Sequence, residues 1–165
     1  MPSAESSLRV GLGYDLHPYA AERPLVLGGV DVAYPRGLAG HSDGDALCHA
    51  VVDALLGAAG LGDIGEWFPP TDETPRGARS LSLLEQVAAR LREAGWRVVN
   101  VDTVLVAQEP RLAPHREAMR ANLATALSVA LDRVNVKATA PERLGSLGRA
   151  DGLAVLATAL IERVS

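Results

Sequence analysis

The chain has 165 residues, of which 48% are hydrophobic and 22% charged, and its formal net charge is -4. This length suits one domain with a hydrophobic core, and this balance excludes a disordered or fibrous protein. The negative charge disfavours binding to nucleic acid, because phosphates would repel it and the arginines form no basic stripe.

Cys48 is the single cysteine, so the chain can form no intrachain disulfide and no cysteine-based zinc cluster. Residues 1–8 lack the charged start and apolar run of a signal peptide, and no apolar stretch is long enough to span a bilayer. We therefore expect a cytoplasmic protein without a membrane segment. It would consist of a flexible tail over residues 1–8 and one domain over residues 9–165.

The first half of the chain predicts two extended segments and a helix. Residues 8–16 and 25–34 are too short and too glycine-rich for helices. Residues 42–59 form the clearest helix, because Ser42 and Asp45 have the spacing of a capping box and the apolar residues that follow keep the helical period. Residues 60–79 are dense in Gly, Pro and Asp and predict a long loop.

The second half alternates helices with strands. We expect helices over residues 80–94 and 114–131, and strands over residues 96–108 and 133–139. Residues 152–164 are apolar on every face, so the pattern leaves strand and helix open. The alternation favours an α/β or α+β arrangement, and we take it as α+β, with helices packed on one face of a mixed β-sheet.

Histidines and aspartates suggest a metal site. Asp15 and His17 flank one residue of an extended segment, so their side chains point to the same side. On a helix, His41, Asp45 and His49 would share one polar face, although such a face is often only solvated surface. Asp15, His17 and His49 could supply three ligands and leave a fourth position open, which is typical of catalytic zinc.

Four segments carry a resemblance to a known family. They are GLGYDLH (11–17), GHSDGDALCHAVVDALLGAAGLGDIGEWFP (40–69), NVDTVLVAQEPRLAPH (100–115) and VNVKATAPERLG (134–145). Together they closely resemble the 2-C-methyl-D-erythritol 2,4-cyclodiphosphate synthases, over nearly the whole chain from Arg9. The resemblance implies a homotrimeric lyase of the non-mevalonate isoprenoid pathway with active sites between subunits. It would convert 4-diphosphocytidyl-2-C-methyl-D-erythritol 2-phosphate into the cyclic diphosphate and release CMP.

The resemblance also implies roles for residues near the first two motifs. Asp15, His17 and His49 would hold Zn²⁺, and Asp15 and His17 would also contact the substrate. His41 and Ser42 would contact substrate phosphate, and His41 would steady the transition state. The remaining residues of this half of the site would surround the methylerythritol: Asp63, Ile64, Gly65 and the segment from Phe68 to Asp72.

The later motifs imply a nucleotide half of the site, supplied by the adjacent subunit. Glu142 would ligate a second divalent ion, Mg²⁺ or Mn²⁺, and Lys137 and Arg149 would help CMP to leave. The residues that would enclose cytidine and its diphosphate are Ala107, Gln108, Pro110, Arg111, Ala113, Thr139, Ala140 and Glu142.

The sequence departs from the family pattern at three places. Ala140 stands where a threonine usually stabilises the transition state, so Thr139, a water or a backbone amide compensates, or the enzyme is slow. Pro70 replaces a common acidic residue. Ser146 replaces an aromatic residue that some members carry at a central channel, while Arg149 is retained, so an isoprenoid diphosphate in that channel is a weaker expectation.

Several residues allow a structural interpretation as well. Asp45 and Asp53 could orient the ligand histidines or could cap and solvate the helix, and Cys48 fits a small buried hydrophobe better than a fourth ligand. His115 fits a solvated first-turn residue. Two other functions stay open beside the cyclase: a non-catalytic metal-bearing trimer that binds nucleotides or isoprenoid diphosphates, and a metal-dependent phosphohydrolase that uses water.

Overall fold

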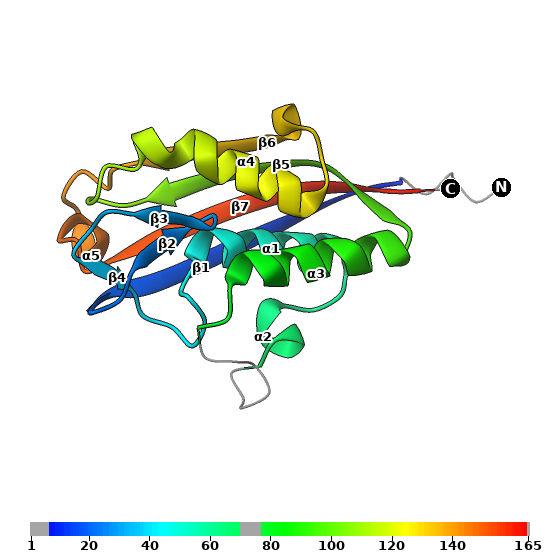
Figure 1. The fold of residues 1–165 in the computed structure, drawn as a ribbon. Coiled ribbons are helices and arrows are strands. Elements are labelled where there is room, and N and C mark those ends of the chain that lie inside the picture. The colour runs from blue at the N-terminus through cyan, green and yellow to red at the C-terminus, as the bar shows by residue number, and fades with distance from the viewer. Residues whose placement is uncertain (1–6, 70–76, 165) are drawn as a thin grey trace.

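The structure, a computed structural model, describes residues 7–69 and 77–164 and is built on a five-stranded mixed sheet (Figure 1). The strand order is β4-β1-β7-β5-β6. Strands β5 and β6 are parallel, and the other neighbouring pairs are antiparallel. The strands of this sheet are β1 (Leu8–Ala21), β4 (Arg36–Leu38), β5 (Trp96–Val106), β6 (Val134–Thr139) and β7 (Gly152–Arg163).

Three long helices cover one face of the sheet (Figure 1). Helix α1 packs on β1 and β7, α3 packs beside α1, and α4 packs on β6. Their bounds are α1 (Ala46–Ala59), α3 (Ser80–Glu93) and α4 (Arg116–Leu127), and two short helices are α2 (Ile64–Trp67) and α5 (Gly145–Gly148). The expected α+β architecture, with helices on one face of a mixed sheet, is confirmed. Within the described ranges, no helix combines the length and apolar character that crossing a bilayer requires.

The opposite face of β1 carries large apolar side chains in solvent. Val10 is 72% exposed and Leu12 67% exposed, and Tyr14 and Leu16 follow them at every second position. Alternation along a strand puts these four side chains on one side and the helix-facing residues on the other. The sheet therefore has one face that the helices bury and one apolar face that is exposed in the single chain, which we call the open face.

Helix α1 rests almost directly on the backbone of β1. A Cβ atom at Gly11 would lie 1.9 Å from the carbonyl oxygen of Ala54, and one at Gly13 would lie 1.9 Å from that of Ala50. No side chain fits in such a gap, so glycine is required at both positions. This close approach fixes α1 against β1. Because Gly11 faces Ala54 and Gly13 faces Ala50, the start of the helix lies beside the residues of β1 that follow Gly13.

The start of α1 differs from the prediction. The helix begins at Ala46, so the capping box from Ser42 is wrong. Asp45 is the N-cap: its carboxylate accepts hydrogen bonds from the backbone N–H of Cys48 at 3.1 Å and from those of Gly28 and Gly29 at 2.8 Å. Asp45 is fully buried, because three N–H donors satisfy its carboxylate. The expected helix face shared with His41 is therefore also wrong.

Other boundaries also differ. Residues 25–34 form not one strand but a hairpin of β2 (Leu25–Leu27) and β3 (Val30–Val32), which turns through two glycines with positive φ. The expected loop over residues 60–79 contains α2. Helix α4 ends before Ser128, which adopts a left-handed conformation. The segment that the pattern left open is β7, an inner strand between β1 and β5, and Leu8 already pairs with Glu162 of that strand.

The close approach predicts a sharp difference between two glycines. Gly13→Ala should lower the free energy of unfolding by about 3 kcal/mol, because the new methyl group must push α1 away from β1. Gly57→Ala is the matched control, since nothing lies within 4 Å of a Cβ there, and it should raise stability by about 0.5–1 kcal/mol. Urea denaturation measures both; equal stability of the two variants would contradict the packing argument.

Candidate metal centre and substrate pockets

Strand β1 presents Asp15 and His17 on the side that faces α1. They continue the row of Gly11 and Gly13, two residues apart each time, and both are partly buried. Asp15 and His17 therefore follow directly after the two glycines that contact α1. The Nε2 atom of His17 is 2.9 Å from Oδ2 of Asp15. The expectation that both side chains share one side of an extended segment is confirmed.

His49, in the first turn of α1, reaches the same place. Its Nδ1 atom is 3.0 Å from Oδ2 of Asp15, and the His17 and His49 ring centres are 5.5 Å apart. One ligand atom from each of the three residues lies within 4.8 Å of the others. Among the described residues, this is the one grouping of three such side chains that could hold a metal ion.

The second nitrogen of each histidine is already engaged. Nδ1 of His17 pairs with the carbonyl oxygen of Ala39, which can only accept, so that nitrogen donates and Nε2, the atom that faces Asp15, is the one that could ligate a metal in place of its proton. Nε2 of His49 lies 2.9 Å from Oγ of Ser80 and 3.1 Å from Oγ of Ser42. Both rings are thereby oriented with the nitrogen nearer Asp15 available to a cation.

Ser80 is itself held by Asp43. The Ser80 hydroxyl donates to Oδ1 of Asp43, and the Ser80 backbone N–H donates to Oδ2 at 3.0 Å. The Ser80 oxygen is therefore free to accept the Nε2 proton of His49. Asp43 and Ser80 orient the ligand histidine, the role that the sequence offered to Asp45 or Asp53. Asp43 could have been found from the sequence, because it lies two residues after His41 in a motif rich in His and Asp. Ser80 could not, because a serine at the start of a helix carries no sequence signal of its own.

The charges suit a cation. Burial would raise the pKa of Asp15, but hydrogen bonds from His17 and His49 outweigh it and lower that pKa to about 2. The same hydrogen bond to Asp15 raises the pKa of His17, more than burial lowers it. A carboxylate that is ionised at neutral pH and two oriented imidazoles form a donor set that fits a divalent metal ion.

The triad opens into a cavity of about 250 Å³. Its other lining residues are His41, Ser42, Ile64, Gly65, Phe68 and Leu83. All of these except Leu83 were predicted. Asp63, predicted to bind hydroxyl groups, caps α2 by accepting from Glu66 N–H at 2.9 Å and is not among the lining residues. Asp53 accepts from Ile64 N–H at 2.8 Å and so anchors α2 to α1.

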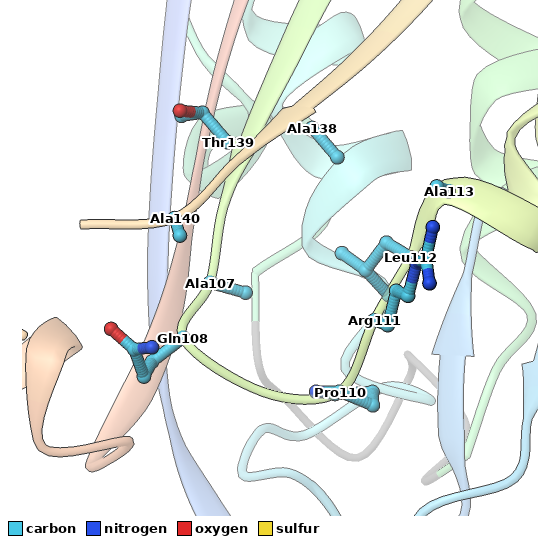
Figure 2. Close-up of a pocket in the computed structure, with 9 residues that line it drawn as sticks. All are labelled: Ala107, Gln108, Pro110, Arg111, Leu112, Ala113, Ala138, Thr139 and Ala140. Carbon is cyan, nitrogen blue, oxygen red and sulfur yellow. The ribbon is translucent and has the colours of Figure 1, made fainter. Parts of the chain in front are cut away.

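A second cavity, of about 230 Å³, lies where β5 and β6 end (Figure 2). Small side chains leave it open, and Figure 2 shows Thr139 directed away from Leu112 and Arg111 across the pocket. It is lined by Ala107, Gln108, Pro110, Arg111, Leu112, Ala113, Ala138, Thr139 and Ala140. Seven of these nine were predicted. Leu112 lies inside the expected segment 107–113 without having been named by itself, and Ala138 lies just before the expected segment 139–142.

The remaining predicted residues lie outside both cavities. Lys137 pairs with Asp102 at 2.6 Å, and Arg149 pairs with Asp151 at 3.0 Å. Glu142 is exposed in a left-handed conformation. Asp72 and Pro70 lie outside the described residues.

The two cavities of one chain are well separated. Leu16 of β1, Ala154 of β7, Val106 of β5 and Thr139 of β6 are successive partners across the sheet. Three strand spacings separate the ends of that row, or roughly 14 Å. The cavities share no lining residue. The metal triad and the nucleotide segments are therefore not brought together within one chain.

Comparisons with known proteins agree with this geometry. The model of the YgbB family matches residues 8–162. The 2-C-methyl-D-erythritol 2,4-cyclodiphosphate synthase of Laribacter hongkongensis is 56% identical over 94% of this chain and 96% of its own length. The synthase of that name from Synechococcus sp. is 54% identical over 98% of this chain and 99% of its own length.

Solved structures give the same result. The bifunctional IspDF of Campylobacter jejuni matches with a TM-score of 0.92 and 44% identity, over 96% of this chain and 43% of that one. The CDP complex of IspF from Plasmodium falciparum matches with a TM-score of 0.85 and 30% identity, over 98% of this chain and all of that one. These matches span the whole sheet and both cavities, and the chain therefore belongs to the YgbB family, together with the 2-C-methyl-D-erythritol 2,4-cyclodiphosphate synthases of isoprenoid biosynthesis.

Proposed function

We propose that this chain closes 4-diphosphocytidyl-2-C-methyl-D-erythritol 2-phosphate into 2-C-methyl-D-erythritol 2,4-cyclodiphosphate. An oxygen of the 2-phosphate bonds to the β-phosphorus, the bond from that phosphorus to the bridging oxygen breaks, and its electron pair leaves with CMP. The convergence of Asp15, His17 and His49 at the mouth of a cavity carries the proposal. No side-chain nucleophile is needed, because the attacking phosphate is already an anion.

Asp15, His17 and His49 would hold zinc. When bound, Zn²⁺ would neutralise phosphoryl oxygens and help to keep the attacking and leaving oxygens in line. His41, which lines the same cavity, would contact the phosphate. Ser42 is 8% exposed and lies 3.1 Å from Nε2 of His49, so its hydroxyl would steady that ligand as well as the substrate.

The substrate's diol would lie against α2. Gly65 and Ile64 line the cavity, and Asp53 fixes their segment through the backbone N–H of Ile64. Phe68 would cover the apolar side of the methylerythritol. Asp63 would bind a hydroxyl with its Oδ2 atom, since the helix cap uses Oδ1.

The second cavity would take the cytidine diphosphate. Ala107, Ala113 and Ala138 line it with single methyl groups, which leave room for a flat base. Two neighbouring structures, among them IspF of Plasmodium falciparum, are complexes with CDP. Glu142, exposed beside this cavity, would ligate Mg²⁺ or Mn²⁺, and Lys137 and Arg149 would offset charge on the departing CMP.

Ala140 bears on the rate of catalytic turnover. Ala140 lines the nucleotide cavity with a methyl group and cannot donate a hydrogen bond, and the Thr139 side chain points away from the cavity's far wall (Figure 2). Losing one transition-state donor costs about 10²-fold in rate where nothing replaces it. We infer that a backbone amide or a water takes this role, or that turnover is slow.

A homotrimer would unite the two cavities. The open face of β1, with Val10, Leu12, Tyr14 and Leu16, is too apolar to be left in water and would be buried between copies of the chain. Because roughly 14 Å separate the two cavities within one sheet, the nucleotide cavity of one copy would instead lie against the metal triad of the next copy. The buried, free Cys48 is compatible with a reducing compartment such as the cytoplasm.

Product analysis tests the reaction. Phosphorus NMR of the zinc-loaded protein with its substrate should show the cyclic diphosphate and CMP. An open-chain phosphate would indicate a phosphohydrolase instead, and no turnover would indicate a non-catalytic binding protein. His49→Ala should lower kcat at least about 10³-fold. His115→Ala, a partly buried histidine at the start of α4, is the matched control and should leave turnover unchanged.

The orientation of His49 through Ser80 predicts an effect on metal affinity. Ser80→Ala removes the acceptor at 2.9 Å from Nε2 of His49 and its link to Asp43, and zinc should bind about 10- to 100-fold more weakly. Competition with a chelator measures the zinc affinity. Ser82→Ala, two residues further along α3, serves as control. Unchanged zinc affinity in Ser80→Ala would show that Ser42 alone orients the ring.

The open face predicts the oligomer. Leu12→Glu places a charge in the centre of that face and should convert trimers into monomers that still bind zinc but form no product. Light scattering measures the mass. Leu131→Glu, on a 46% exposed leucine outside that face, should leave the trimer intact. A wild-type protein that is monomeric at working concentration would contradict the shared site.

A further inference from the structure

Glu109, in the segment 107–113 that we call the nucleotide loop, is hydrogen-bonded to residues of β1 and of the segment before β4. Glu109 lies between the pocket residues Gln108 and Pro110. Its backbone carbonyl accepts a hydrogen bond from the Tyr19 hydroxyl, and its Oε2 accepts one from the Tyr34 hydroxyl at 3.2 Å. Two tyrosines, 90 and 75 positions away in the sequence, therefore hold the main chain and the side chain of one loop residue.

An arginine completes the cluster. Arg36 donates to the Tyr34 hydroxyl at 2.7 Å, and its guanidinium lies 4.9 Å from the Tyr19 ring centre and 5.5 Å from that of Tyr34. The two rings are 5.3 Å apart. The charge stacks on both rings and fixes the direction of the Tyr34 hydroxyl toward Glu109.

The cluster is anchored in the part of the fold that carries the metal triad. Tyr19 follows His17 by two residues on β1, and its strand position pairs with Leu38 of β4. Tyr34 lies between β3 and β4, and both rings pack against the hydrophobic core. Figure 1 shows the ends of β1 and β5 together with β4 at one end of the sheet.

The other side of the loop is held as well. Oε1 of Gln108 accepts from Arg143 N–H at 2.9 Å, and Ala107 N–H donates to the Thr139 carbonyl at 3.1 Å. These bonds tie the start of the loop to the segment that contains Glu142. Gln108 is thus hydrogen-bonded to the segment after β6, and Glu109 is hydrogen-bonded to Tyr19 of β1 and to Tyr34.

We propose that Tyr19, Tyr34 and Arg36 are positioning residues that hold Glu109 and so keep the nucleotide loop in the shape that accepts a cytidine diphosphate. The proposal rests on the function given above. None of the three residues lines either cavity, so they act through the loop rather than on the substrate. A loop fixed before the ligand arrives loses less conformational entropy when the ligand binds, and this raises affinity.

Removing the two hydroxyls tests the proposal. In Tyr19→Phe/Tyr34→Phe both rings, their packing and the Arg36 stacking remain. The bonds from the two hydroxyls to Glu109 are lost, together with the bond that Arg36 donates to the Tyr34 hydroxyl. We expect CDP to bind about tenfold more weakly to the zinc-loaded trimer and KM for the substrate to rise by a similar factor, with kcat nearly unchanged. Calorimetry with CDP measures affinity, and chelator competition and thermal unfolding measure zinc affinity and stability.

Variants of Glu109 separate positioning from general stability. Glu109→Ala should weaken CDP binding, and Glu109→Gln, whose amide oxygen can still accept from Tyr34, should restore most of it. Glu85→Ala, on an exposed glutamate of α3, is the control for loss of a surface charge.

The outcomes are distinct. Weaker CDP binding at unchanged zinc affinity and unchanged melting temperature supports the proposal. CDP affinity equal to wild type in the double Phe variant overturns it, and so does a parallel fall of CDP affinity, zinc affinity and melting temperature. A wild-type protein that binds no CDP overturns both this proposal and the proposed function, whereas wild-type binding with indifferent variants overturns this proposal alone.

Discussion

The site depends on the contact between two glycines of β1 and the backbone of α1. Because Gly11 and Gly13 lack side chains, the helix comes so close that its carbonyl oxygens occupy the space of a Cβ atom. The next two residues in that row are Asp15 and His17, and the first turn of α1 carries His49. A helix raised by even one methyl group would lift His49 from Asp15, since the ligand atoms are only 3.0 Å apart. The backbone packing of α1 on β1 therefore also sets the distances between the three candidate metal ligands.

Much of this could be predicted from periodicity and local chemistry. The alternation along β1 correctly placed Asp15 and His17 on one side, and the pairing with His49 is confirmed by the geometry. The predicted helix start was wrong because Asp45 has distant partners: the N–H groups of Gly28 and Gly29 belong to the turn between β2 and β3, and no local spacing reveals them. Ser80 was missed for the same reason, since its role depends on Asp43 and His49 across the fold.

The nucleotide half illustrates a different limit. The resemblance named most lining residues of the second cavity, yet it could not say that Thr139 points away from the far wall or that Lys137 pairs with Asp102 on the open side of the sheet. Side-chain direction along β6 alternates, so neighbouring residues of one motif serve different faces. A motif identifies which residues gather in a segment. The strand pairing decides which of them can meet a ligand.

The separation of the two cavities has a genetic consequence. If each site joins the triad of one copy to the nucleotide loop of its neighbour, a chain with a defective triad and a chain with a defective loop are each inactive alone. In a ring that contains both kinds, one junction always joins the sound triad of the second chain to the sound loop of the first. Two null alleles of this gene would therefore restore partial activity to each other when they are co-expressed.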